Sequence, residues 1–246
     1  MKTKTFFFTL IFCLLLALPA CSFTIGDTEF TTVTGSGNVV TEERPISGVK
    51  RVSLSNQGDL TVVIGAAESL VIEAEDNLLD YIQTEVRGGT LEIDTQNGVN
   101  MDNIDPIRYT LTVKSLEGID INSSGGAVLP ALTVDSFEIN INSSGDTSVE
   151  SLTAEKLTVH ISSSGQVDIA GGMVVTLDVT ISSSGDLHME DVVVQDAKVS
   201  ISSSGSAYLQ VSGDLKGNIS SSGNIYVTGS PQVDVNTSSS GKVVQR

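Results

Sequence analysis

The 246-residue sequence has few aromatic, cysteine and histidine residues. It contains no tryptophan, and aromatic residues make up only 4% of the chain. Both cysteines, Cys13 and Cys21, lie in the first stretch, so no pair remains to form a disulfide in a mature protein. The two histidines, His160 and His188, are far apart in the sequence. We therefore expect no Cys/His metal site and no metal or other cofactor.

Basic residues are also scarce. Lysine and arginine together number 13, against 30 aspartates and glutamates, and the formal net charge is −17. A surface of this sign repels phosphate backbones and anionic lipid headgroups, which argues against a nucleic-acid partner. Acidity of this kind favours solubility.

A short pattern recurs through the second half of the chain: a β-branched residue, usually isoleucine, then Ser or Asn residues, then glycine. The pattern ends at seven glycines spaced 20, 20, 20, 20, 18 and 18 residues apart: Gly125, Gly145, Gly165, Gly185, Gly205, Gly223 and Gly241. A fixed period of this length predicts stacked structural repeats.

Apolar and polar residues alternate on both sides of each glycine. Val179 and Ile181 precede Gly185, and Leu187 and Met189 follow it, with polar residues between them. This period of two is typical of a strand with one buried face. Each repeat therefore reads as a strand, a bend and a second strand, and most repeats add a third short apolar segment, such as 192–194.

No repeat has room for a crossover helix, so equivalent strands can pair in parallel only if the chain coils once per repeat. The sequence thus predicts an all-β fold, a right-handed parallel β-solenoid with coils of about 18–20 residues. We expect the bend glycines to adopt a positive φ. We also expect the bend serines to form hydroxyl columns, with copies about 4.8 Å apart.

Residues 1–20 have the features of a signal peptide. Lys2 and Lys4 precede an apolar core that is too short for a comfortable membrane span. The following Leu18-Pro19-Ala20-Cys21 resembles the lipobox of bacterial lipoproteins. That resemblance implies cleavage between Ala20 and Cys21, and lipidation of Cys21 as the membrane anchor of an exported cell-envelope protein. The alternative is an ordinary secretory signal with a chance cysteine.

We expect residues 21–37 to form a polar tether and residues 38–246 to form the solenoid domain. The bend 56–60 is a degenerate copy of the later bends, so the first coil lies here. A helix-like turn is expected at 76–82 and a hairpin at 83–94. The sequence between the first coil and the regular coils predicts an irregular N-terminal cap, which protects the end of the solenoid from edge-to-edge association.

These motifs together resemble those of the auto-transporter adhesin head GIN domain family. The resemblance covers roughly residues 45–235. It rests on four segments before the Ser-Ser-Gly coils: Ile46–Val52, Gly58–Val62, Asp76–Ile82 and Glu85–Leu91. It implies a right-handed β-solenoid on bacterial lipoproteins and surface proteins. The resemblance assigns no catalytic residue to this sequence, because none is established for the family.

One column of outward residues is a candidate binding surface. Asp120, Asn140 and His160 occupy the same position in three successive repeats, so we expect them to form a surface ladder. The column contains a single carboxylate, whereas paired acids are needed for glycoside hydrolysis. No serine lies in a Gly-x-Ser-x-Gly elbow. The sequence therefore predicts no catalytic residue and no enzyme.

Three functions are compatible with such a surface. The favoured one is a lipid-anchored adhesin or surface-binding module that meets a polysaccharide or a surface protein through its polar ladder. A structural spacer on the cell surface is the main alternative. A polysaccharide-active β-helix enzyme is the third. The low aromatic content counts against strong stacking on sugars.

Overall fold

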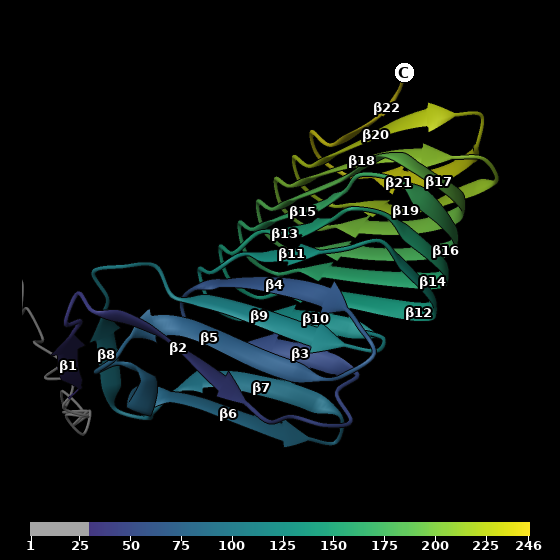
Figure 1. Ribbon diagram of the computed structural model, residues 1–246. Coiled ribbons are helices and arrows are strands. Elements are labelled where there is room, and N and C mark those ends of the chain that lie inside the picture. Colours follow the sequence, from purple (N-terminus) through teal and green to yellow (C-terminus); the bar gives the residue numbers. More distant parts are fainter. Residues whose placement is uncertain (1–29) are drawn as a thin grey trace, which may run out of the picture.

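The computed structural model describes residues 30–246, whose regular secondary structure is β-strand apart from one 3-10 turn (Figure 1). The N-terminal part contains β1 (Thr31–Thr34), β2 (Val39–Arg44), β3 (Arg51–Leu54), β4 (Asp59–Ile64), β5 (Ser69–Glu75), the 3-10 turn η1 (Leu79–Tyr81), β6 (Ile82–Arg87), β7 (Thr90–Thr95), β8 (Val99–Asp102) and β9 (Arg108–Val113). The coils contain β10 (Gly118–Ile121), β11 (Ala127–Leu129), β12 (Leu132–Ile141), β13 (Thr147–Val149), β14 (Leu152–Ile161), β15 (Gln166–Ile169), β16 (Gly172–Ile181), β17 (Asp186–Ile201), β18 (Ser206–Val211), β19 (Asp214–Ile219), β20 (Asn224–Gly229), β21 (Gln232–Thr237) and β22 (Lys242–Gln245).

The coils form the predicted parallel β-solenoid. Equivalent residues pair from one turn to the next: Ile121 with Ile141, Ile141 with Ile161, and Ile161 with Ile181. The strand segments before the bends, from β10 to β21, form one row. The segments after the bends, from β11 to β22, form a second row. The first residues of β12, β14 and β16 make a short third row, as the apolar segment 192–194 led us to expect.

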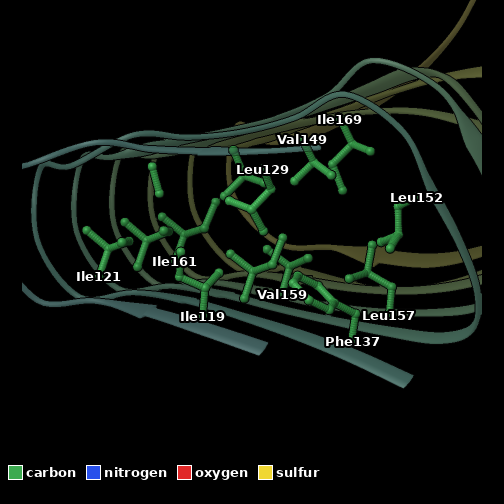
Figure 2. Packing of buried hydrophobic residues seen from close by; sticks show 14 of the residues in the cluster. Ile119, Ile121, Leu129, Phe137, Val149, Leu152, Leu157, Val159, Ile161 and Ile169 are labelled. Carbon is green, nitrogen blue, oxygen red and sulfur yellow. The ribbon is translucent and has the colours of Figure 1, made fainter. Parts of the chain in front are cut away.

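The interior is filled by the inward residues of all three rows (Figure 2). The isoleucine four residues before each of the first six bend glycines is buried, as predicted: Ile121, Ile141, Ile161, Ile181, Ile201 and Ile219. Before Gly241 the same position holds Thr237, which is exposed. Phe137, Val159 and Leu129 belong to the same buried cluster and are labelled in Figure 2. At about 25 cal/mol per Å² of apolar area buried, this continuous core is the main source of stability in a fold without disulfides.

The bend glycines are required for a different reason from the one we predicted. None of the seven regular bend glycines has a positive φ, whereas Gly58 in the degenerate first bend does, at 120°. A Cβ atom at Gly165 would lie 2.6 Å from Ile141 Cγ2 and would also overlap the carbonyl oxygen of Gly145 in the preceding turn. Close approach of successive turns therefore excludes a side chain at the bend.

The first coil and the cap match the predicted arrangement. β3 pairs in parallel with β10, and β4 with β11, so segment 51–64 is the first turn of the solenoid. The predicted hairpin is formed by β6 and β7, with Gly88 and Gly89 at positive φ. The helix-like turn is shorter than expected and consists of η1 alone. β2 and β9 flank β5 in antiparallel fashion and complete the cap.

The end of the predicted tether is ordered. Within segment 21–37, residues 31–34 form β1, which pairs in parallel with β8. The buried carboxylate of Glu75 accepts hydrogen bonds from the backbone N–H groups of Gly37 (2.7 Å) and Ile104 (2.9 Å). The predicted signal peptide, Ala20 and Cys21 lie outside the described residues.

Candidate functional site

The predicted column of Asp120, Asn140 and His160 is formed as expected. β10 pairs with β12 so that Asp120 is opposite Asn140, and β12 pairs with β14 so that Asn140 is opposite His160. Ser53 of β3 extends the column by one turn toward the cap. All these side chains are half-buried on the outer face of the first row.

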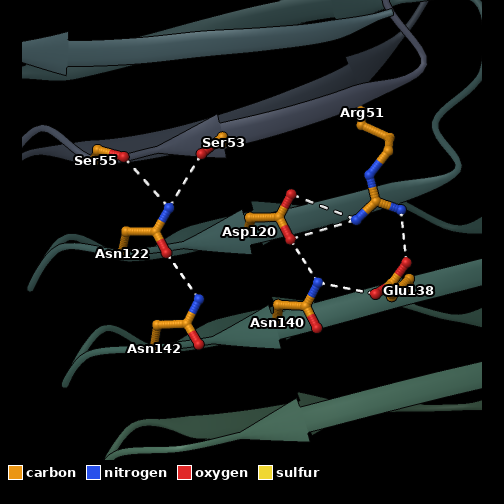
Figure 3. Close-up of polar contacts among 8 residues, drawn as sticks. All are labelled: Arg51, Ser53, Ser55, Asp120, Asn122, Glu138, Asn140 and Asn142. Carbon is orange, nitrogen blue, oxygen red and sulfur yellow. Dashed lines mark hydrogen bonds and ion pairs between the residues drawn. The ribbon is translucent and has the colours of Figure 1, made fainter. Parts of the chain in front are cut away.

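Two residues that the sequence analysis missed, Arg51 and Glu138, convert this column into a network (Figure 3). The Arg51 guanidinium donates to Asp120 Oδ1 at 3.3 Å and to Glu138 Oε2 at 2.9 Å. The Asn140 amide donates to Asp120 Oδ1 at 2.5 Å and to Glu138 Oε1 at 3.0 Å. The acidic and amide groups are therefore held in fixed positions rather than forming a row of independent solvated side chains.

Gly118 makes room for this network. It lies between Arg51 and Glu138 in the register, opposite both of them on neighbouring strands. A Cβ atom at Gly118 would lie 2.5 Å from Arg51 Nη1 and 2.9 Å from the Glu138 carbonyl oxygen. The missing side chain allows the Arg51 guanidinium to cross the strand and reach the following turn.

The network keeps one carboxylate ionised. The hydrogen bond from Asn140 lowers the pKa of Glu138 below its usual value, and the positive charge of Arg51 acts in the same direction. Partial burial opposes these effects without overcoming them. A general acid in sugar hydrolysis needs a raised pKa, so Glu138 is unsuited to that role.

A second polar row runs beside the network at the bends. Asn122 donates to Ser53 and Ser55, at 3.1 and 3.3 Å, and Asn142 donates to Asn122 at 2.8 Å (Figure 3). Ser162 continues the row by donating to Asn142 at 3.0 Å. In the later turns of residues 30–246 the bend serines occupy equivalent positions, but no hydrogen bond joins the hydroxyls of Ser182, Ser202 and Ser220. There the turns are linked by backbone bonds, such as Ser182 N–H to the Ile161 carbonyl oxygen.

An open groove adjoins the network at the corner between the first and third rows. Its volume is about 570 Å³. The lining is polar, with hydroxyl, carboxylate and guanidinium groups, and consists of Arg51, Ser115, Glu117, Thr133, Val134, Asp135, Ser136 and Glu138. Such groups can donate and accept hydrogen bonds to a polar ligand. No group of three metal-ligating side chains is found in the described part of the chain.

Comparison with known families supports the resemblance predicted from the sequence. Residues 49–231 match the family model described as "Putative auto-transporter adhesin, head GIN domain". The chain belongs to this family. An adhesin-like family indicates a surface or envelope location. No curated protein matches the chain.

Solved structures share the fold of this head GIN protein. A "putative adhesin" from Bacteroides fragilis has 19% sequence identity and a TM-score of 0.81, and the match covers 87% of this chain and 100% of that one. A "putative adhesin" from Parabacteroides distasonis has 20% identity and a TM-score of 0.73, covering 88% and 100%. A "putative lipid binding protein" from the same species has 23% identity and a TM-score of 0.73, also covering 88% and 100%.

The head GIN coils also contain an aromatic ladder that the sequence analysis missed. In the second row the rings of His188 and Tyr208 stack at 4.5 Å between centroids, and those of Tyr208 and Tyr226 at 4.7 Å, with interplanar angles of 8°. The Arg246 guanidinium lies 4.6 Å from the Tyr226 centroid. Because the rings cover one another, this ladder leaves no free face for a sugar between them. His188, Tyr208 and Tyr226 each follow a bend glycine by three positions, so alignment of the repeats could have identified the stacked rings.

No helix within residues 30–246 is long and apolar enough to cross a membrane.

Proposed function

We propose that this head GIN protein is a lipid-anchored module of the bacterial cell envelope that binds a surface partner through its polar rows and has no catalytic activity. The observation that carries the proposal is the Arg51–Asp120–Glu138–Asn140 network beside an open polar groove. Fixed polar groups reduce the ordering cost of binding, so they are suited to recognition of a polar surface.

The anchor is proposed at Cys21, on the strength of Leu18-Pro19-Ala20-Cys21 after the apolar segment. Cleavage after Ala20 removes Lys2 and Lys4, so the net charge of the mature chain is −17 − 2 = −19. Lipid modification is needed to hold so acidic a protein at a membrane surface, because headgroup electrostatics do not favour it.

Anchoring is tested by detergent-phase separation of the whole chain and its Cys21→Ser variant. We expect the wild-type protein in the detergent phase and the variant in the aqueous phase. A wild-type protein that stays in the aqueous phase contradicts the lipid anchor.

The absence of catalysis is supported by the state of the carboxylates. Glu138 is held in its ionised form, and both Glu138 and Asp120 are engaged by Arg51 and Asn140. Glu138 is therefore unsuited to deliver a proton to a leaving group. The polysaccharide-active alternative needs such a donor within reach of the groove.

The binding function is tested with the soluble form, residues 22–246, on a panel of immobilised envelope polysaccharides and surface proteins. Retention is measured for the wild type, for Glu138→Gln and for Asp178→Asn. Asp178 lies two turns beyond Glu138 in the same register, away from the groove, and serves as the matched control.

We expect retention by at least one class of partner, reduced by Glu138→Gln and unchanged by Asp178→Asn, with no new reducing ends in the polysaccharides. A protein that binds nothing in the panel and releases no product favours the spacer. New reducing ends that disappear in Glu138→Gln favour the enzyme.

A further inference from the structure

The aromatic ladder of the second row contains the only stacked pair of tyrosines within residues 30–246. Tyr208 of β18 is paired in register with Tyr226 of β20, and their ring centroids are 4.7 Å apart at an interplanar angle of 8°. In-register residues of neighbouring strands present equivalent atoms at about the strand spacing, so the carbons ortho to the two hydroxyl groups are neighbours. The pair therefore places two phenols face to face on one chain.

Tyr208 is enclosed between two other rings. His188 precedes it by one turn in the register, and the two ring centroids are 4.5 Å apart at an interplanar angle of 8°. Tyr226 covers the opposite face. The Arg246 guanidinium carbon lies 5.6 Å from the Tyr208 centroid and 4.6 Å from the Tyr226 centroid, so its positive charge helps to hold both rings. A radical on Tyr208 therefore has Tyr226 as its nearest phenol, and another chain cannot approach either face of its ring.

The other tyrosines of the chain are placed differently. The chain contains four tyrosines, and the remaining two are Tyr81 and Tyr109 in the cap. Tyr109 is only 1% exposed, and Tyr81 belongs to η1. Tyr208 and Tyr226 are both partly exposed, so a small oxidant can reach them from solvent. Oxidative coupling within the chain is therefore directed to one pair.

The turns next to this pair have little else to secure them. Both cysteines, Cys13 and Cys21, precede the described residues, so no disulfide links these turns. Val233 of β21 occupies an inward position but is 46% exposed, whereas its register partner Leu215 in the preceding turn is completely buried. Segments with few buried apolar contacts open locally at low free-energy cost. A covalent link between turns has its largest effect at this end of the coils.

We propose that Tyr208 and Tyr226 are an oxidative cross-linking site, at which a one-electron oxidant joins the two rings through their ortho carbons to give dityrosine. Each phenol loses one electron and its hydroxyl proton and becomes a phenoxyl radical. The two radicals pair to form the carbon–carbon bond. Each ring regains its aromaticity when the ortho hydrogen leaves as a proton and the oxygen takes up another. Overall the chain loses two electrons and two protons, which convert one hydrogen peroxide into two waters in the presence of a haem peroxidase.

The cross-link acts as a staple between successive turns. A bond between β18 and β20 closes a loop of one 18-residue repeat. Closure of such a loop stabilises the folded state mainly by restraining the unfolded chain. Rotation about χ2, a broad torsion in tyrosine, brings the two ortho carbons toward each other. The inference concerns the persistence of the coils and stands whether or not the polar network binds a partner.

The test treats the full chain with hydrogen peroxide and a haem peroxidase, once in the folded state and once in urea. The variants Tyr208→Phe and Tyr226→Phe keep the stacked ring and remove one phenol each. Tyr81→Phe removes a phenol from the cap and keeps the pair, so it is the matched control. We expect dityrosine fluorescence on monomeric chains from the folded wild type and from Tyr81→Phe, and none on monomeric chains from the other two variants.

The position of the bond is read by peptide mapping. Lys216 lies between the two tyrosines, so trypsin places them in separate peptides, 199–216 and 217–242. In the oxidised wild type these peptides should be joined, with the loss of two hydrogen atoms. Oxidation should also raise the thermal midpoint of the wild type by several degrees and leave that of Tyr226→Phe unchanged.

Three results would overturn the proposal. The first is no cross-link between the two peptides under conditions that couple a free tyrosine derivative. The second is dityrosine that mainly joins two chains, or that forms equally well in urea, because the stacked pair then does not direct the coupling. The third is a cross-link that leaves the thermal midpoint unchanged, because the bond then does not staple the turns.

Discussion

Arg51 Nη1 and Glu138 Oε2 are 2.9 Å apart, although the whole of β10 lies between their strands, β3 and β12. The ion pair thus joins the first, irregular coil to the second regular one. It depends on the absence of a side chain at Gly118, over which Arg51 passes. The local consequence is a polar surface with defined geometry at the junction of cap and coils.

Gly118→Ala should break this junction. The new Cβ would lie 2.5 Å from Arg51 Nη1 and 2.9 Å from the backbone oxygen of Glu138. Overpacking of this kind costs about 1–3 kcal/mol of unfolding free energy. Gly171→Ala is the control, because a Cβ there meets nothing within 4 Å and the residue has no positive φ.

The two alanine variants are compared by urea unfolding of the soluble form. Gly171→Ala should leave the midpoint unchanged or raise it slightly, since it restricts the unfolded chain. Equal midpoints for Gly118→Ala and Gly171→Ala would show that Arg51 does not need the space above Gly118.

The network should also make stability depend on pH. Asn140 and Arg51 lower the folded-state pKa of Glu138 below its unfolded value, near 4.5. Its contribution is therefore fully present above that value and is lost as the pH falls through the unfolded and then the folded pKa. Urea midpoints measured from pH 7 to pH 3 should show the stability gap between wild type and Glu138→Gln closing below about pH 4.5. A gap that stays constant over this range contradicts the assigned hydrogen bond and ion pair.

The register of the solenoid is tested by two adjacent substitutions. Ile181 is completely buried, and Thr180 faces outward in the polar column beyond His160. Ile181→Asp places an unpaired carboxylate in the core and should cost about 3–5 kcal/mol. Thr180→Asp should change stability by no more than about 0.5 kcal/mol. Thermal midpoints measure both, and a larger loss for Thr180→Asp would mean that the strands are displaced by one residue.

The repeat pattern was sufficient to predict the solenoid, because period-two alternation and a fixed glycine spacing are properties of the sequence itself. Ile121, Ile141 and Ile161 are buried at the predicted positions for this reason. The Asp120–Asn140–His160 column followed from the same alignment. The alignment could not predict contacts that depend on the distance between successive turns. The bend glycines are the clearest example, because a side chain at Gly165 is excluded by close contacts with the preceding turn and not by its φ angle.

The rest of the site depends on long-range contacts outside the period. Arg51 lies 69 residues before Asp120 in the sequence, in a coil that is separated from the regular ones by the cap insertion. The order in segment 30–37 depends on the buried carboxylate of Glu75, whose partners are 38 and 29 residues away. Such pairings have no local sequence signal.

The central claim is that this head GIN protein binds its partner through the polar network and does not transform it. The most direct measurement is the equilibrium affinity of the soluble form for the partner it retains, compared with a variant carrying Asp120→Ala, Asn140→Ala and His160→Ala together. Loss of hydrogen-bonding groups should weaken binding roughly tenfold, or about 1.4 kcal/mol. The thermal midpoint should change little, because half-exposed pairs contribute little to stability. An unchanged affinity, or a product whose formation is abolished by Asp120→Ala alone, would contradict the account.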